Sequence, residues 1–551
     1  MKIGQAEKSI RENYAWLARL VELAETKISQ GDFEAGIALV QVCADFASRN
    51  HAGIFTSNRL ENCLKKLSAN IQPLVEAPLP VEGSVVDSSK HVVHIMTESH
   101  PVGGSSRLAW RWINNDKANT HSVILTAQGA SDVPQLLQAA VTKSGGSLHN
   151  IGKSKASKMQ RASEIRAIAQ HACIVVLHIH PHDPLALVAL SQWRERPLIL
   201  MMNHADHLFW LGASVADHYI SFRSTGHDIS QQRRGITAEM CSVIPIPIEQ
   251  VEPKLTKKEC KAQLGITEDD VVCVTMGFSY KFQPADRCTH FVDAILPIFE
   301  QHKNVHLVAI GPTREGKWSN AYSVSNGRIR AMGECADTDV YLNAGDLFLM
   351  PIPIHSHTAA LEAGNCGMPV LAYTNPLLSD TVFGADSLSL THSVINTTSI
   401  SEFREKLVTL ITDAELRKVT GEQTQSLIQQ VHGKPAWLGL LNKTMEQAQL
   451  RSQIGEVVFD NTALCLPEDI QLVEIERGLL ARPAIMLIRH CESLSVSTKI
   501  HLWLNYFKPI KSFRLKYSFL EPILLVLPPT QLIKLRSYFE HNQLFRRIFL
   551  Q

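Results

Sequence analysis

The stretch that decides the fold is GDLFLMPIPIHSHTAALEAGNCGMPVLAY, residues 345–373. It contains an apolar strand, a polar turn, a short helix with one Glu, and a second strand after Gly-Met-Pro. In a parallel α/β sheet the turn after a strand directs the first amide N–H groups of the next helix outward. We therefore expect an anion site at His357, Thr358 and Ala359, with Glu362 one turn further along. A phosphate next to a carboxylate suits a nucleotide sugar.

The order of these residues resembles the nucleotide-sugar signature of GT-B glycosyltransferases of group 1 (GT4). That pattern ends in Leu-Glu-Ala, a short spacer and Gly-x-Pro-Val, which residues 361–370 match. The resemblance implies that Glu362 holds the ribose hydroxyls of the donor and that the preceding turn approaches its diphosphate. Many members carry an acidic residue eight positions earlier, where this chain has Ile354. We expect His355 or His357 to serve there instead.

The composition agrees with a large globular protein. A chain of 551 residues predicts about three or four domains. With 45% hydrophobic and 19% charged residues it can bury large cores, and a net charge of +1 gives no general attraction to nucleic acid. The 11 cysteines form no C-x-x-C pair, so we expect reduced thiols rather than disulfides or a zinc site.

The N-terminal segment, residues 1–75, is predicted to contain only helices. Apolar residues recur at helical spacing on both sides of a Gly-Asp pair at Gly31 and Asp32. One such hairpin falls short of the three or so repeats that a helical solenoid needs, so we expect a packing or oligomerisation appendage. Prolines and a glycine indicate a linker over residues 76–90.

Residues 91–250 alternate between apolar runs and helical stretches, as in a doubly wound parallel sheet. Gly103 and Gly104 follow the first apolar run, just before a helix. Two glycines let a backbone approach a ligand closely, and the resemblance implies a turn that faces the donor diphosphate or the acceptor. An ordinary tight turn is the other explanation of this pair. The predicted strands are 91–98, 122–126, 172–178 and 197–202.

His204 and Asp206 come directly after the strand at 197–202, so we expect them to line the crevice at the carboxyl ends of the strands. The resemblance implies a histidine beside the transferred sugar. Histidine can donate to a sugar hydroxyl or, paired with Asp206, act as a general base. We predict these two as catalytic residues and predict no bound metal. A cleft-lining loop is also predicted for His178, His180 and His182.

Residues 251–450 are predicted to form a second Rossmann-like domain that begins with a strand at 271–276. Gly277 ends this strand, and Lys281 follows where a cation can neutralise a diphosphate. The family usually keeps an arginine directly after the glycine, but this chain has a phenylalanine there. Lys281 must then carry more of the charge, or Arg314 must assist.

The C-terminal extension, residues 451–551, lies outside the resemblance. Its Arg489-His490-Cys491-Glu492 imitates a histidine-phosphatase motif, and we interpret this as chance because only about 60 residues follow. Residues 499–551 contain nine basic and two acidic residues with aromatic residues between them. This composition indicates either a helical module for a membrane surface or a partner, or a helical cap with a solvated charged face.

These features predict an α/β protein of two Rossmann-like domains (GT-B) with helical segments at both ends. The predicted activity is transfer of a hexosyl or N-acetylhexosaminyl group (EC 2.4), in glycan biosynthesis, from a UDP- or GDP-type nucleotide sugar to a glycan, lipid-linked or protein acceptor. No cofactor is expected. The resemblance implies retention of configuration without a metal; inversion with His204 or Asp206 as base is the alternative. The predicted donor-binding residues are Gly103, Gly104, Gly277, Lys281, His357, Thr358 and Glu362.

Two other functions stay open. A nucleotide-sugar epimerase or hydrolase can use the same cleft, and the missing acid at Ile354 with the large helical flanks fits a non-catalytic scaffold. We expect no signal peptide, because residues 1–30 are polar and periodic, and no apolar run reaches the roughly 20 residues that span a bilayer. We therefore expect a cytoplasmic protein that binds no nucleic acid. Peripheral contact at the inner face of the membrane through 499–551 and oligomerisation through the helical ends are further expectations.

Overall fold

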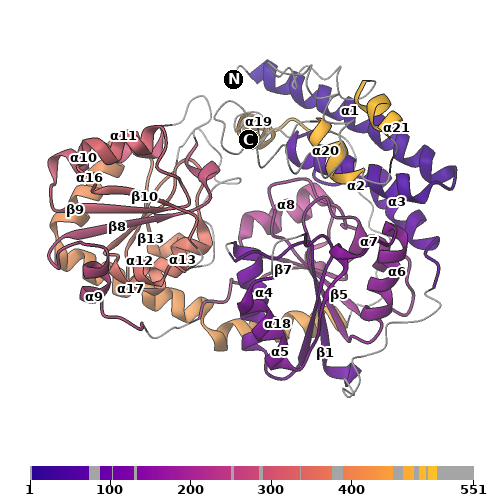
Figure 1. The fold of residues 1–551 in the computed structure, drawn as a ribbon, viewed down its shortest axis with the longest axis horizontal. Coiled ribbons are helices and arrows are strands. Elements are labelled where there is room, and N and C mark those ends of the chain that lie inside the picture. Colours follow the sequence, from indigo (N-terminus) through magenta and orange to yellow (C-terminus); the bar gives the residue numbers. More distant parts are fainter. Residues whose placement is uncertain are drawn as a thin grey trace.

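Two parallel sheets, each between layers of helices, form two lobes that lie side by side (Figure 1). The first sheet has the strand order β3-β2-β1-β4-β5-β6-β7 and the second β10-β9-β8-β11-β12-β13. The predicted α/β fold with two Rossmann-like sheets is confirmed. The structure is a computed structural model that describes residues 3–73, 87–101, 103–129, 133–249, 253–283, 289–335, 337–374, 389–450, 463–476, 483–491, 494 and 496–504.

In the first sheet, strands β1, β4 and β5 are buried along their whole length, which explains their continuous apolar runs. The order reverses between β1 and β4, and a crevice opens at the carboxyl ends of the strands at such a switch point. The strands are β1 (His91–Met96), β2 (Thr120–Leu125), β3 (Leu148–Asn150), β4 (Ile174–His178), β5 (Leu198–Met202), β6 (His218–Ser221) and β7 (Cys241–Val243). The helices are α4 (Gly104–Asn115), α5 (Gln135–Ser144), α6 (Lys158–Ala169), α7 (Leu185–Leu190) and α8 (Ser224–Arg234).

The second sheet has its switch point between β8 and β11, so the loops after these two strands form its ligand edge. Its strands are β8 (Val271–Met276), β9 (Val305–Ile310), β10 (Ile329–Gly333), β11 (Leu347–Leu349), β12 (Val370–Tyr373) and β13 (Val394–Thr397). Its helices are α9 (Lys257–Gln263), α10 (Phe291–Gln301), α11 (Lys317–Val324), α12 (Asp339–Ala344), α13 (His357–Asn365), α15 (Leu390–Ser393), α16 (Ile400–Thr412) and α17 (Ala414–His432).

The chain crosses between the lobes twice. It enters the second lobe after β7 and returns in α18 (Lys434–Gln449), which lies under the first lobe (Figure 1). Trp437 and Leu441 of α18 join the core cluster on one face of the first sheet. At the crossing, the amide of Ile248 donates to the carbonyl of His432 (3.0 Å), and the His432 ring bonds the carbonyl of Ile246 (2.8 Å). The two crossing segments are therefore joined side by side.

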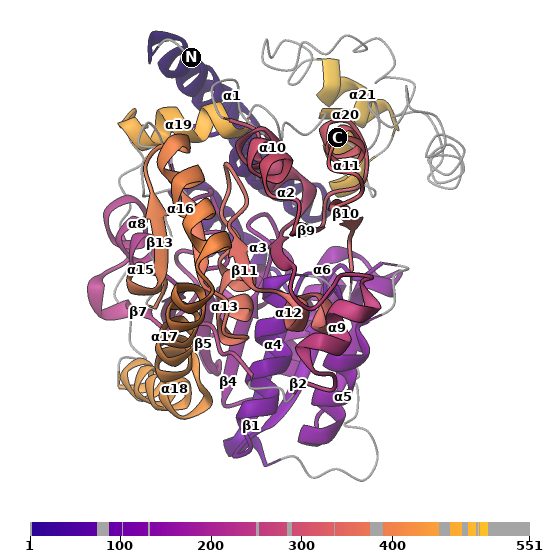
Figure 2. The ribbon, with the colours of Figure 1, turned by 90° about the vertical axis from the view of Figure 1, so that its left-hand side faces the viewer.

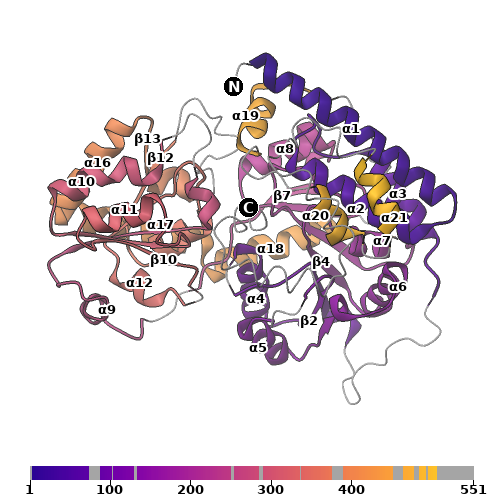
Figure 3. The same ribbon diagram turned by 45° about the horizontal axis from the view of Figure 1, so that its top comes forward.

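The N-terminal segment packs on the first lobe (Figure 3). The predicted hairpin is present as α1 (Ile3–Ser29) and α2 (Phe33–Arg49), and α3 (Asn58–Ala69) follows. Glu61 of α3 is buried and accepts hydrogen bonds from the amide of Gly212 (2.8 Å) and from the amide and hydroxyl of Ser214 (3.1 and 2.6 Å). Apolar residues of these helices share one core with the first sheet.

The described part of the C-terminal extension packs against the N-terminal helices. It contains α19 (Pro467–Glu476), α20 (Pro483–His490) and α21 (Val496–Leu502), and α19 lies beside α1 in Figures 1 and 2. Met486, Leu487 and Trp503 join the core of the first lobe. Most of the basic, aromatic stretch lies outside the described residues, as does most of the linker predicted at 76–90. Among the described helices, none has the length and apolarity that crossing a membrane requires.

Candidate active site between the lobes

The Gly-Gly turn of the first lobe meets the start of α13 in the second lobe. A Cβ atom on Gly104 would lie only 3.1 Å from the hydroxyl oxygen of Thr358, so the absence of a side chain permits this approach. Gly103 has φ +135°, a backbone conformation that favours glycine. The structure thus brings together Gly103, Gly104 and Thr358 from distant parts of the sequence, at the N-terminus of α13 where amide N–H groups are free to bind an anion.

Glu362 faces the other lobe, where two arginines hold it. Its carboxylate forms an ion pair with Arg107 and another with Arg111, whose Nη2 lies 2.7 Å from Oε1. The arginines are one turn apart on α4, directly after the Gly-Gly turn. Although burial alone would raise it, the two guanidinium groups hold the pKa of Glu362 below its usual value. The carboxylate therefore stays charged between the lobes.

Lys281 lies beneath the turn that precedes α13. Its Nζ donates to the carbonyl of His355 (2.8 Å), and burial lowers its pKa to about 8. A Cβ on Gly277 would lie 3.1 Å from the Lys281 side chain, so this glycine leaves room for the lysine. Arg314, the alternative cation, instead packs on the ring of Tyr322, 4.5 Å from the ring centroid. Of the two cations, Lys281 is the one beside the α13 turn.

The two histidines expected near the donor sugar differ in their surroundings. His355 Nε2 bonds the carbonyl of Tyr373 (3.1 Å), which fixes this ring toward the end of β12. His357 is half-buried, and its buried Nε2 has no hydrogen-bond partner within the described part of the chain. Burial lowers the pKa of His357 well below its usual value, and the nearby charges of Arg223 and Lys281 add to this effect. His357 is therefore neutral, and Arg223 of the first lobe is near enough for its charge to act on this ring.

The position of the missing family acid is filled by an apolar contact. Ile354 packs against Phe55, Ile229 and Leu472, which come from the N-terminal segment, α8 and α19. This contact joins the second lobe to the first lobe and to the helical segments at both ends of the chain.

Asp206 does not pair with His204, contrary to the expected general-base pair. Its carboxylate is held by Arg223, with Nε 2.5 Å and Nη2 2.8 Å from the two oxygens, and by His207 at 3.2 Å. Burial favours the neutral acid, but Arg223 and His207 still lower the pKa of Asp206 far below its usual value. The carboxylate is a structural anion that positions the loop after β5.

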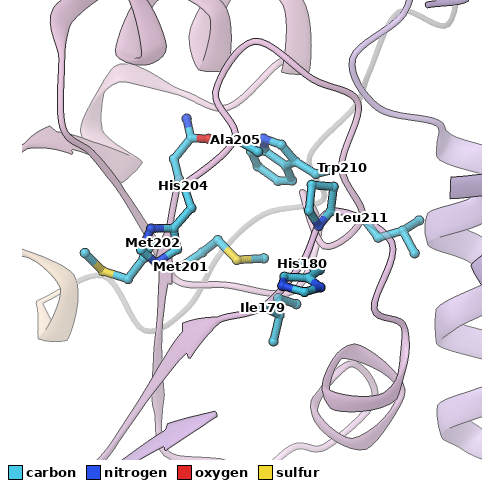
Figure 4. A pocket seen from close by; sticks show the side chains of 10 residues that line it. Ile179, His180, Met201, Met202, His204, Ala205, Trp210 and Leu211 are labelled. Carbon is cyan, nitrogen blue, oxygen red and sulfur yellow. The ribbon is translucent and has the colours of Figure 1, made fainter. Parts of the chain in front are cut away.

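His204 lines a small pocket at the ends of β4 and β5 (Figure 4). Its Nε2 lies 3.2 Å from Nδ1 of His178, and burial lowers its pKa to about 4. At neutral pH the ring is uncharged and acts as a hydrogen-bonding group. The pocket is also lined by Ile179, His180, Met201, Met202, Trp210 and Leu211.

Residues 271–413 match the sequence profile of the family described as glycosyl transferases group 1. The fold is GT-B, and its second lobe contains a domain that matches the group 1 glycosyltransferases. The domain contains the second sheet and the residues Gly277, Lys281, His357, Thr358 and Glu362. A sequence comparison with functionally described proteins gives no significant match.

Solved GT-B structures share the fold over both lobes. HepE of Anabaena in complex with UDP and glucose has 15% sequence identity and a TM-score of 0.51, covering 65% of this chain and 99% of its own. The same protein with UDP-glucose gives 14% identity and a TM-score of 0.50 over 66% of this chain and 100% of its own. A glycosyltransferase from Rickettsia africae has 11% identity and a TM-score of 0.48, covering 66% and 100%.

The cations that bind Glu362 and Asp206 were not among the residues predicted from the sequence. Arg107 and Arg111 were detectable, because two arginines four residues apart share one face of the helix that follows the Gly-Gly turn. Arg223 gives no such signal, since β6 and its loop bring it to Asp206 only in the folded chain.

The histidine of the phosphatase-like motif also has a place in the fold. His490 Nε2 lies 2.8 Å from Oδ2 of Asp45 on α2, and Nδ1 of His182 lies 3.7 Å from Oδ1. Arg49 binds the same carboxylate at 2.6 Å, so a cation already compensates its charge. This cluster connects α2, the loop after β4 and α20. The absence of a bound metal stays a prediction.

Proposed function

We propose that the protein transfers a sugar from a nucleoside-diphosphate sugar, bound between the lobes, to a glycan, lipid-linked or protein acceptor. One observation carries this proposal: α13 contacts the first lobe at two points. Thr358 at its N-terminus lies against the Gly-Gly turn, and Glu362 pairs with the arginines of α4 that follow this turn. A carboxylate and an anion site, one turn apart on one helix, match the ribose and diphosphate of one ligand.

Glu362 is the proposed ribose ligand. In the structure its two oxygens accept hydrogen bonds from two arginines, and the adjacent hydroxyls of a ribose offer the same two donors. Donor binding then replaces the contacts of Arg107 and Arg111 with Glu362. The released guanidinium groups remain on α4, next to the turn that faces the diphosphate, where they add positive charge.

The diphosphate leaving group is stabilised by Lys281 and by the first amides of α13. As the sugar–phosphate bond breaks, negative charge grows on the phosphate oxygens. Oriented amide dipoles and a half-buried lysine are already in place and need little reorganisation to stabilise this charge. A UDP-hexose is the favoured donor, since HepE of the same fold is described with UDP-glucose.

His204 and His357 are proposed to contact the sugar or the acceptor hydroxyl. Both are neutral at physiological pH, so they can exchange hydrogen bonds without competing with Lys281 for the diphosphate. Because the Asp206 carboxylate is paired with Arg223, it does not act as the base. This supports transfer with retention of configuration, in which the leaving phosphate accepts the proton.

The test is a panel of UDP-, GDP- and ADP-sugars, first for binding by thermal shift and then for release of the free nucleotide in the presence of acceptor candidates. We expect a UDP-sugar to raise the melting temperature of the wild type and to have a weaker effect on Glu362→Gln. No stabilisation by any nucleotide sugar would overturn the proposal. An epimer or free sugar as the only product would support an epimerase or hydrolase instead.

A further inference from the structure

Four histidines form a continuous row across the first sheet. His121 Nδ1 lies 3.0 Å from His94 Nε2, His94 Nδ1 lies 3.1 Å from His178 Nε2, and His178 Nδ1 lies 3.2 Å from His204 Nε2. The first three rings are almost fully buried. His94 and His178 each use both ring nitrogens within the row, so no break occurs between His121 and His204.

The pairing of the strands explains why the row forms. His121 pairs in register with Val92 of β1, and His94 lies two residues further along the same strand. The same step of two residues leads from Val176, the partner of His94, to His178 on β4. Because side chains alternate along a strand, a step of two keeps every ring on one face of the sheet. Trp112 of α4 and Trp437 of α18 cover this face.

The two ends of the row differ in charge. At one end Asp116, at the end of α4, has an oxygen 3.3 Å from Nε2 of His121. Burial favours the neutral acid, but hydrogen bonds from His121 and Asn119 still lower the pKa of Asp116, so it is a carboxylate. At the other end His204 lines the pocket, and its Nδ1 makes no hydrogen bond to any described residue.

We propose that Asp116 sets the tautomer of His204 through this row and thereby fixes Nδ1 of His204 as an unprotonated acceptor for a substrate hydroxyl. The Asp116 carboxylate lies 3.3 Å from Nε2 of His121 and can only accept a hydrogen bond, so it favours the tautomer of His121 with the proton on Nε2. Its Nδ1 then accepts from His94, which accepts in turn from His178, and His178 accepts from Nε2 of His204. Each neutral ring has one N–H, so no proton is left for Nδ1 of His204.

The environment keeps the rings neutral, as this arrangement requires. Burial, together with the neighbouring histidines, lowers the pKa of His94 and of His178 well below the usual value. Asp116, His121, His94 and His178 are positioning residues, since none of them lies at the pocket. The inference rests on the proposed function only for the identity of the hydroxyl, which belongs to the donor sugar or to the acceptor.

The first experiment reads the tautomers directly. NMR of protein labelled with 15N in histidine distinguishes a protonated from an unprotonated ring nitrogen by chemical shift, without any substrate. We expect His204 to be protonated at Nε2 and unprotonated at Nδ1. The opposite tautomer in the wild type would overturn the proposal.

The second experiment reverses the tautomers of the row by a substitution at Asp116, the end far from the pocket. In Asp116→Asn the amide can donate to His121, which then accepts at Nε2, so each ring shifts and His204 presents a protonated Nδ1. Asp116→Glu retains a carboxylate and should keep the wild-type tautomer. Asn119→Ala is the matched control, because it removes a bond to the Asp116 carboxylate (2.9 Å) and leaves the row intact. An unchanged His204 tautomer in Asp116→Asn, with the fold intact by its melting temperature, would also contradict the proposal.

Kinetics then connect the row to transfer. Asp116→Asn should lower kcat about tenfold with little change in donor KM, because Asp116 is remote from the donor site, and Asp116→Glu should restore most of it. Equal kcat in Asp116→Asn and wild type, despite a reversed tautomer, would show that the row has no part in transfer. A wild type that transfers no sugar would instead contradict the proposed function, while the NMR result would still decide the tautomer.

Discussion

Glu362 is the residue on which the donor site depends, and its substitution is the most direct test. In Glu362→Gln the side chain keeps its size but loses its charge and one acceptor, so it holds ribose hydroxyls less well and leaves two arginines without a counter-charge. We expect donor KM to rise or kcat to fall at least about tenfold, equal to about 1.4 kcal/mol. Steady-state kinetics with a UDP-sugar measure this.

The control for that substitution is Glu405→Gln on α16, where the side chain is exposed and far along the chain from the site. It removes the same charge from the same lobe. If Glu362→Gln and Glu405→Gln both keep wild-type kinetics, Glu362 does not bind the donor.

The lowered pKa of Lys281 predicts that donor binding depends on pH. Its pKa is lowered from 10.5 to about 8 by burial, and only the protonated amine attracts a diphosphate. Donor KM should therefore rise about tenfold between roughly pH 7 and pH 9 in the wild type. Lys281→Met should show a high donor KM with no such rise. A flat KM profile in the wild type would contradict the role of Lys281.

The lowered pKa of Lys281 affects the stability of the fold in the opposite direction: stability increases with pH while donor binding weakens. Between about pH 8 and pH 10.5 the unfolded chain binds the Lys281 proton and the folded chain does not. The contribution of this group to the free energy of unfolding therefore increases as pH rises through that window and is lost below about pH 8. Donor binding and stability thus respond to Lys281 with opposite signs.

At the scale of residues, the sequence predicts the positions that depend on local order. Gly104, Thr358, Lys281 and Glu362 each lie at the end of a strand or the start of a helix, and the structure brings them to one region between the lobes. The pairing of Asp206 could not be predicted, because Arg223 is brought to it by β6, a short strand whose alternation is weak.

Among the elements, α3 carries a buried carboxylate, Glu61, that bonds the first lobe. Glu61→Ala would leave the amides of Gly212 and Ser214 buried without an acceptor. We expect the free energy of unfolding to fall by about 3 kcal/mol, as measured by chemical denaturation. Asn62→Ala, an exposed change on the same helix, should stay within about 0.5 kcal/mol of wild type. Equal stabilities for the two variants would show that Glu61 does not anchor the segment.

The elements that sequence analysis predicts best are the long apolar strands. The expected strand at 271–276 coincides with β8, and the one expected at 91–98 contains β1. The strands β3, β6 and β13 were missed, because they have three or four residues and contain polar side chains such as His149, His218 and Asn396. Their strand conformation comes from pairing with a neighbour rather than from their own pattern.

At the scale of the whole molecule, the ion pairs of Glu362 hold the two lobes together in the absence of donor. Replacing both Arg107 and Arg111 by Gln leaves a buried carboxylate without a cation, and water can reach it only if the lobes separate. We expect a larger radius of gyration in small-angle X-ray scattering of this double variant.

The control for that measurement is the double variant of Arg404 and Arg417 to Gln. These arginines bond carbonyls within the second lobe, so their loss removes the same charge without affecting the contact between lobes. An equal radius of gyration in both double variants and in wild type would show that the Glu362 pairs do not hold the lobes closed.

The double passage of the chain beneath the lobes limits how they can move. Because the segments at Ile246–Ile248 and His432 are bonded to each other, they act as one narrow pivot rather than two separated tethers. Trp437 and Leu441 fasten the returning helix to the first sheet, so sliding of one lobe along the other is opposed. Rotation about this pivot would widen the far rim most, and it would have to break the contact of Ile354 with Phe55, Ile229 and Leu472. A bulky acceptor would then enter from the rim beside the N-terminal helices, opposite the pivot (Figure 1).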